Sequence, residues 1–192
     1  MFEGAYTAII TPFNTEGAVD YECLRSLIDR QLNAGVDGIV PVGTTGESPT
    51  LSMDEHSRVI DTAIEACQGR AKVIAGTGAN ATAEAIELTA HAKEAGADGT
   101  LQVTPYYNKP TQWGLIQHFS AVADIGLPVV LYNVPGRSGR EIAVETVAEL
   151  AQHEHIAAVK EAGGSVDRVS QIMDCCDIEV LSGDDSLCFP MM

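Results

Sequence analysis

The sequence predicts an α/β fold, a TIM (β/α)8 barrel of which this chain carries about seven βα units. Apolar runs of strand length alternate with amphipathic segments of helix length along all 192 residues. Strict alternation with apolar strands is typical of a parallel sheet covered by helices. A doubly wound sheet has the same alternation, but polar, glycine-rich loops follow nearly every strand here, which favours the barrel.

The predicted strands are short apolar runs, most of them closed by glycine, proline or polar residues. They span residues 6–11, 38–42, 72–75, 99–104, 128–132, 156–159 and 178–181. A complete barrel takes about 250 residues, and no eighth strand follows before Met192. We therefore expect residues 1–192 to form one barrel domain that lacks strand eight and the C-terminal helices. Its open strand edges favour aggregation, so we expect the isolated chain to fold poorly or to be inactive.

The predicted helices begin at capping residues and end at glycine or polar residues. Asp20 caps the first helix and Gly35 stops it, while Ser52 and Glu55 have the spacing of a capping box. The predicted helices cover residues 20–33, 52–67, 82–96, 112–124, 144–152 and 166–174.

Composition excludes several functional classes. The net charge is −16, from 27 acidic and 11 basic residues, which argues against binding nucleic acid or an anionic membrane surface. Five cysteines without metal-ligand spacing predict free thiols in a reducing compartment, and no HExxH motif occurs, so we expect neither metal nor cofactor. The amino terminus lacks signal-peptide features and no apolar run has transmembrane length. These features predict a cytoplasmic protein.

Lys160 is the first candidate catalytic residue, because it alone among the four lysines emerges from the end of an apolar strand. Burial there lowers the pKa of an amine and leaves it nucleophilic. Lys72 precedes its strand, Lys93 lies on a helical stretch, and Lys109 lies in a loop. The alternative for Lys160 is a lysine at a strand end that extends into solvent.

Other polar side chains follow the ends of other predicted strands, where a barrel gathers its catalytic groups. They are Thr44, Thr45, Tyr106, Tyr107, Tyr132 and Arg137. With Lys160 these supply an amine for an imine, a phenol and hydroxyls for proton transfer, and a guanidinium for a carboxylate. Singly, each has an ordinary alternative: a core tyrosine, a surface arginine or turn hydroxyls. The loop GTGAN after strand three has only part of a phosphate-binding pattern.

Three segments carry a resemblance to a known family. They are GTTGES at 43–48, YNVPGRSG at 132–139 and VKEAGG at 159–164. The sequence resembles the pyruvate-dependent class I aldolase family that contains dihydrodipicolinate synthase and N-acetylneuraminate lyase. The resemblance runs from TAIITPF near the amino end to SGDDSL near the last residue. The double threonine, TPYYN at 104–108 and Arg137 resemble the dihydrodipicolinate synthase branch.

The resemblance implies a set of roles for these residues. Lys160 would form the imine with pyruvate, Tyr132 would act as acid and base, and Thr45 would hold the pyruvate carboxylate. Arg137 would position the carboxylate of aspartate semialdehyde. The product would be 4-hydroxy-tetrahydrodipicolinate, on the diaminopimelate route to lysine.

The resemblance also implies self-association and regulation. Thr44 would link Tyr132 to Tyr107, which would enter the site of a neighbouring subunit across a tight dimer, within a dimer of dimers. Inhibition by lysine at that interface would use five residues. They are Ser48, His56, Asn80, Glu84 and Tyr106. Met53 replaces a histidine often found there, and Glu84 has the alternative of an ordinary helix carboxylate.

Two other functions stay open on the sequence alone. A related aldolase would use the same lysine on N-acetylneuraminate or on 2-keto-3-deoxy sugar acids. An inactive relic would keep the fold without the chemistry.

Overall fold

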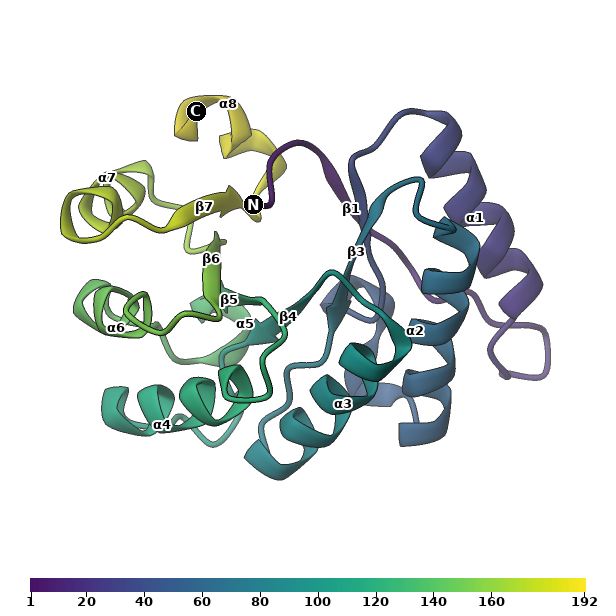
Figure 1. Cartoon of the computed structure of the whole chain (residues 1–192), viewed down its shortest axis with the longest axis horizontal. Helices are drawn as coiled ribbons and strands as arrows, with labels where there is room; N and C mark the ends of the chain where they lie inside the picture. Colours follow the sequence, from purple (N-terminus) through teal and green to yellow (C-terminus); the bar gives the residue numbers. More distant parts are fainter. The chain divides into compact units, whose positions relative to one another are not determined.

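The computed structural model describes all 192 residues and contains seven strands (Figure 1). They are β1 (Tyr6–Ala8), β2 (Gly38–Val40), β3 (Lys72–Gly76), β4 (Gly99–Val103), β5 (Val129–Asn133), β6 (Ile156–Glu161) and β7 (Glu179–Ser182). The strands are neighbours in the sheet in the same order as in the chain, from β1 to β7. Parallel strands in chain order, alternating with helices, are the βα units of a TIM (β/α)8 barrel, so the predicted fold class is confirmed.

Eight α-helices follow or connect these strands. They are α1 (Tyr21–Asn33), α2 (Met53–Cys67), α3 (Thr82–Ala95), α4 (Gln112–Ala123), α5 (Pro135–Ser138), α6 (Val144–Leu150), α7 (Val166–Cys175) and α8 (Cys188–Met191). Three single 3-10 turns are η1 (Thr44–Gly46), η2 (Ser48–Thr50) and η3 (Asp185–Leu187). None of the helices combines the length and the apolar character that crossing a membrane requires.

The chain divides into two compact units, which we describe separately. Unit 1 comprises Met1–Phe2, Gly78–Ile86 and Gln102–Met192, and unit 2 comprises Glu3–Thr77 and Glu87–Leu101. Strand β4 therefore begins in unit 2 and ends in unit 1. That residues 1–192 form one domain stays a prediction.

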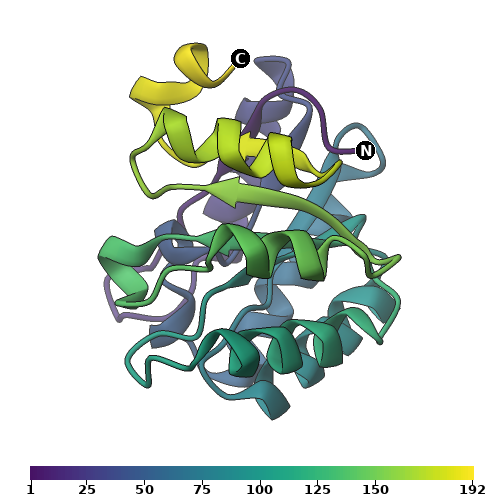
Figure 2. The ribbon, with the colours of Figure 1, turned by 90° about the vertical axis from the view of Figure 1, so that its left-hand side faces the viewer.

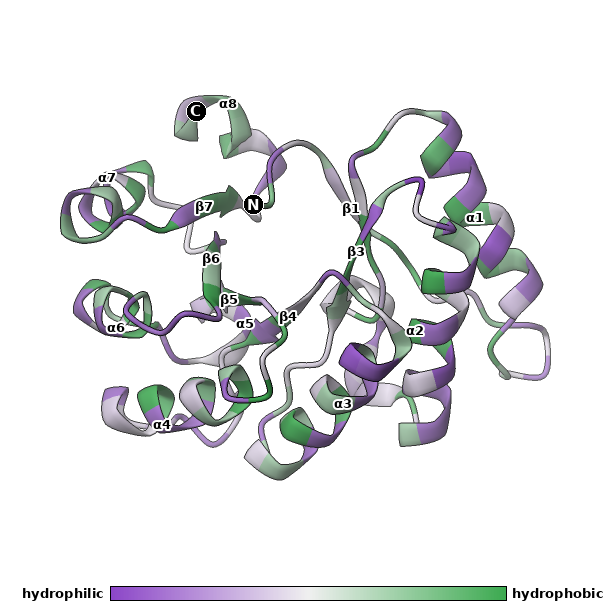
Figure 3. Ribbon diagram, viewed as in Figure 1, coloured by the Kyte–Doolittle hydropathy of each residue, from purple (hydrophilic) through white to green (hydrophobic).

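In unit 2, parallel pairing runs from β1 through β2 and β3 to the start of β4. Helices α1 and α2 pack side by side, and purple and green residues alternate along both in Figure 3, as expected of amphipathic helices. The predicted caps are present: Asp20 accepts a hydrogen bond from the amide of Cys23, and Ser52 and Glu55 form the capping box. Local sequence signals therefore placed these helix starts correctly.

In unit 1, strands β5, β6 and β7 pair in parallel. Helices α4, α6 and α7 lie side by side in Figure 2, with α6 in contact with both of the others. Fully buried side chains from these helices and strands form one hydrophobic core. It includes Leu115, Phe119, Val129, Leu131, Val147, Val159 and Ile172. This core faces one side of the β5–β6 pair and fixes which strand residues point away from it.

The first two residues of the chain also belong to unit 1. Phe2 is only 2% exposed, and its amide donates to Glu179 Oε2 at 2.6 Å. The ammonium group of Met1 forms an ion pair with the same carboxylate. The amino terminus is thereby attached to the first residue of β7.

Several segments differ from the sequence prediction, and three of them lie at strand ends or in the loops that follow. β1 ends at Ala8 instead of residue 11, and β2 ends at Val40 because Pro41 lacks an amide hydrogen and Val42 turns the chain with φ of 53°. Residues 135–138, predicted as a loop, form the single turn α5. Pro135 begins this turn and Gly139, with φ of 72°, ends it.

Phe119 tests the core of unit 1. Because its ring is fully buried, Phe119→Ala should lower the free energy of unfolding by about 3–5 kcal/mol. Urea unfolding followed by circular dichroism measures this loss. Trp113→Ala, on the same helix but 69% exposed, is the matched control and should change stability by less than about 0.5 kcal/mol. Equal losses in both variants would contradict the described core.

Candidate active site

Lys160 and Tyr132 lie beside each other on adjacent strands. The β5–β6 register pairs Tyr132 with Lys160, and the Lys160 Nζ lies 4.6 Å from the centre of the Tyr132 ring. Their chain neighbours Leu131 and Val159 face the helical core. Because side chains alternate along a strand, Lys160 and Tyr132 occupy the opposite face. The structure thus brings the predicted amine and the predicted phenol together.

Burial sets the electrostatics of Lys160. Desolvation lowers the pKa of its amine, the charge of Arg137 acts in the same direction, and the charge of Asp185 partly opposes both. Gly183 leaves room for the lysine, since a Cβ there would lie 2.9 Å from Lys160 Cε. A partly buried amine with a lowered pKa is the form of lysine that attacks carbonyl carbons.

The guanidinium of Arg137 extends from α5 into solvent. The turn that carries it is fixed by the buried Ser138, whose hydroxyl donates to the carbonyls of Val134 and Arg140 at 3.2 and 2.8 Å. Arg137 itself is exposed, and its charge lowers the pKa of Lys160. The arginine is therefore an exposed cation on a hydrogen-bonded turn, available to an anionic ligand.

Tyr106 and Tyr107 follow β4 and differ in exposure. Tyr107 is 91% exposed and has φ of 74°, a left-handed conformation that non-glycine residues seldom adopt. Tyr106 is half-buried, and its carbonyl accepts from Asn80 Nδ2 at 3.3 Å. Burial, followed by the charge of Glu84, raises the pKa of Tyr106. Asn80, Glu84 and Tyr106, three members of the predicted lysine site, are thus neighbours in unit 1.

The two threonines of the predicted site lie in unit 2, on the turn η1. Thr44 is half-buried and Thr45 is exposed. The hydroxyl of Thr11 donates to the carbonyl of Gly46 at 2.6 Å and anchors this turn. Val42, directly before it, has the left-handed φ of 53°, a conformation that costs a β-branched residue on the order of 1–3 kcal/mol. Strain of this size next to a polar turn is typical of functional loops.

Ser48 and His56, the remaining predicted lysine-binding residues, also lie in unit 2. Ser48 begins η2 and is half-buried. His56 is 4% exposed, and its Nε2 lies 2.7 Å from the carbonyl oxygen of Gly76. Burial lowers the pKa of His56. One ring nitrogen of His56 is thus engaged by the backbone.

Sequence reasoning missed a buried polar cluster behind the lysine. Glu161 is fully buried and accepts hydrogen bonds from Asn133, from the amide of Gly163 and from Arg168. One signal in the sequence could have found it. Glu161 continues the strand alternation on the face of Val159, where a carboxylate requires partners because it is removed from water.

His118 is a second buried polar residue that the sequence analysis missed. Its Nδ1 lies 2.9 Å from the Thr82 hydroxyl, its Nε2 is buried without a hydrogen-bond partner, and burial lowers its pKa to about 4. The imidazole is therefore neutral at physiological pH.

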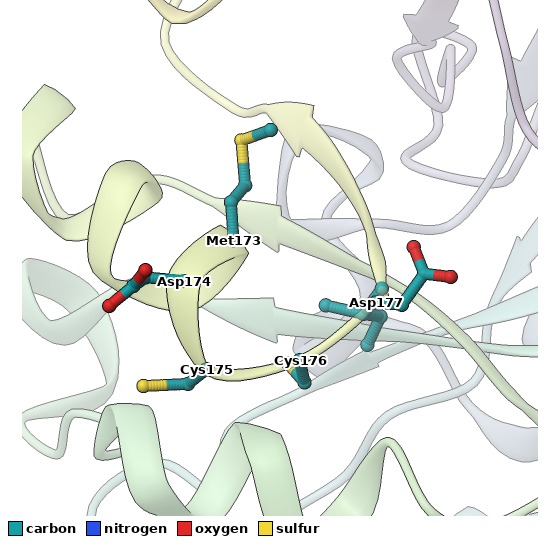
Figure 4. A pocket seen from close by; sticks show the side chains of 6 residues that line it. Met173, Asp174, Cys175, Cys176 and Asp177 are labelled. Atoms are coloured by element: carbon teal, nitrogen blue, oxygen red, sulfur yellow. The ribbon is translucent and has the colours of Figure 1, made fainter.

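A shallow hollow on the surface lies apart from the predicted site residues, and no metal cluster is preformed. The hollow, of about 360 Å³, lies where α7 ends and the chain enters β7 (Figure 4). Its lining includes Met173, Cys175 and Asp177 but none of the predicted site residues. No group of three or more histidine, cysteine or acidic side chains is arranged to hold a metal ion. All five cysteines are free thiols.

Comparisons with known proteins agree with the geometry. The profile of the dihydrodipicolinate synthetase family matches residues 1–192. The 4-hydroxy-tetrahydrodipicolinate synthases of Geotalea uraniireducens and Geobacter sulfurreducens are each 58% identical over 100% of this chain and 67% of their own length. The crystal structure of dihydrodipicolinate synthase from Aquifex aeolicus superposes with a TM-score of 0.97 at 54% identity, over 99% of this chain and 66% of that one.

This chain therefore spans about two thirds of the length of the relatives that it matches. The match extends over every segment that positions Lys160, Tyr132 and Arg137. The chain belongs to the dihydrodipicolinate synthetase family.

Proposed function

We propose that the protein condenses pyruvate with L-aspartate 4-semialdehyde through an imine on Lys160, giving 4-hydroxy-tetrahydrodipicolinate. The observation that carries the proposal is the half-buried Lys160 amine, with its pKa lowered by desolvation, beside the Tyr132 ring. Relatives that carry the name of this synthase support the choice of substrates. The free thiols fit a reducing compartment, and we place the protein in the cytoplasm.

The reaction begins with attack of the Lys160 amine on the carbonyl carbon of pyruvate and loss of water. Loss of a methyl proton from the imine gives an enamine, whose carbon attacks the aldehyde of the semialdehyde. The amine of the semialdehyde then displaces Lys160 and closes the ring. Tyr132, Thr44 and Tyr107 move protons in these steps, and Thr45 and Arg137 hold the two substrate carboxylates.

Self-association and regulation form the second part of the proposal. Tyr107 is 91% exposed in this chain, which suits a side chain that completes the site of a second copy, within a dimer of dimers. Lysine inhibits by binding at Ser48, His56, Asn80, Glu84 and Tyr106. Support comes from Asn80, Glu84 and Tyr106, which are close together, with Glu84 available to a ligand ammonium.

Imine formation is tested directly with pyruvate and sodium borohydride. Because reduction fixes the imine, intact mass should show a pyruvyl adduct in the parent chain and none in Lys160→Ala. Supplying aspartate semialdehyde, N-acetylmannosamine and sugar-derived aldehydes in turn identifies the second substrate. An adduct that persists in Lys160→Ala would contradict the role of this lysine, and turnover with another aldehyde alone would contradict the choice of substrate.

The pH dependence follows from the lowered pKa of Lys160. Imine formation requires the neutral amine, so the trapping rate at saturating pyruvate should rise with pH, and the midpoint of this rise should lie below pH 10.5, the ordinary lysine pKa. Asp185→Asn should shift this rise to lower pH, because the Asp185 charge favours the protonated amine. A rise centred at or above pH 10.5 would show that burial does not activate the lysine.

Tyr132→Phe tests proton transfer. The variant keeps the buried ring and removes only the hydroxyl, so turnover should fall by about 100-fold, within the usual range for a lost acid or base. Product formation measures turnover, and circular dichroism verifies the fold. Tyr21→Phe removes the same hydroxyl from a half-buried tyrosine at the start of α1 and is the matched comparison, which should keep the turnover of the parent. Turnover within about two-fold of the parent would exclude an acid–base role for Tyr132.

A further inference from the structure

A buried carboxylate lies directly behind the reactive lysine. Glu161 follows Lys160 in β6, and its side chain enters the helical face of the sheet, where it is fully buried. Its oxygens accept from Asn133 Nδ2 at 2.8 and 3.0 Å, from the Gly163 amide at 2.7 Å and from Arg168 Nε at 2.8 Å. Every partner is a donor, so the site is built for an ionised carboxylate.

This cluster extends beyond Glu161 to the segment before α6. The Arg168 guanidinium donates to the Ile142 carbonyl and lies 3.7 Å from the Glu141 carboxylate. The Ile142 amide donates in turn to Asn133 Oδ1 at 3.0 Å. One carboxylate thus connects the ends of β5 and β6, the turn after β6, helix α7 and the chain entering α6.

We propose that Glu161 is a positioning residue for imine formation, acting on Lys160 and Tyr132 through the backbone that they share with the buried cluster. The register pairs Asn133 with Glu161 directly beside the pair of Tyr132 with Lys160. Hydrogen bonds between Asn133 and Glu161 on one face therefore fix the separation of Tyr132 and Lys160 on the other. This inference rests on the proposed Lys160 chemistry.

Gly163 shows how closely the cluster is fitted. A Cβ at this position would lie 2.6 Å from Glu161 Oε1, so any other residue would have to displace the carboxylate. In Glu161→Gln, one carboxylate oxygen is replaced by an NH2 group. In either orientation of the amide, this NH2 group would face another donor, either the Gly163 amide or Arg168 Nε. Glu161→Gln is nearly isosteric and therefore disturbs the cluster with little change in volume.

A purely stabilising ion pair and a positioning role predict different measurements. Loss of stability alone lowers the observed trapping rate in proportion to the folded fraction, but leaves the rate constant per folded molecule unchanged. Loss of alignment lowers that rate constant, because a displacement of about 1 Å between reacting groups costs on the order of 100-fold in rate. The time course gives the observed rate, and circular dichroism gives the folded fraction by which that rate is divided.

The experiment follows borohydride trapping at saturating pyruvate by intact mass. It uses the 192-residue chain and, in parallel, the chain extended by the C-terminal third of the Geotalea uraniireducens relative. In Glu161→Gln the trapping rate constant should fall about 10- to 100-fold. The half-saturating pyruvate concentration should stay the same, because the residues that hold the pyruvate carboxylate are untouched. Arg168→Lys keeps the positive charge but loses the several fixed N–H donors of the guanidinium. We expect its rate constant to lie between those of the parent and Glu161→Gln.

Val59→Ala is the matched control. Val59 is buried in α2 of unit 2, so its truncation lowers stability without touching the cluster, and its trapping rate constant should equal that of the parent. A rate constant per folded molecule in Glu161→Gln that equals that of the parent would overturn the positioning role alone. A parent that forms no adduct in either version would overturn the proposed function, and the inference with it.

Discussion

The register between β5 and β6 is the constraint on which the site depends. One ladder of backbone hydrogen bonds pairs Tyr132 with Lys160 and Asn133 with Glu161, so one pairing serves both faces of the sheet. Lys160 and Tyr132 lie on one face of the sheet, and the buried polar cluster of Asn133 and Glu161 lies on the other. A slip by one residue would turn Lys160 into the helical core and expose Glu161 on the reactive face. The hydrophobic core that contains Leu131 and Val159 makes such a slip costly.

Charge and burial act in opposite directions on this site. The chain carries a net charge of −16, and a negative surface favours protonated amines and repels carboxylate substrates. At Lys160 desolvation outweighs the nearby Asp185, so the pKa falls in spite of the acidic surroundings. Arg137 contributes a local positive charge on an exposed turn. The pKa of Lys160 is thus determined by its burial and by nearby charges, although the net charge of the chain would act in the opposite direction.

The sequence was sufficient for the parts of the site that local patterns determine. Lys160 could be recognised because it alone emerges from an apolar run, and caps such as Ser52 with Glu55 fixed helix starts. Arg168 could not be paired with Glu161 in advance, because seven residues and a turn separate them and only tertiary packing joins them. Similarly, the α5 turn depends on a hydrogen bond from the Ser138 hydroxyl to the Val134 carbonyl, which the order of residues alone does not specify.

The attachment of the amino terminus to β7 has a practical consequence for making this protein. The Met1 ammonium and the Phe2 amide share the Glu179 carboxylate, which is itself only 34% exposed. An affinity tag fused ahead of Met1 converts that ammonium into a neutral amide and leaves a partly shielded carboxylate without its cation. The bulk of the tag also begins where Phe2 enters the interior. A fusion at the amino terminus should therefore weaken the attachment of residues 1–2 to β7.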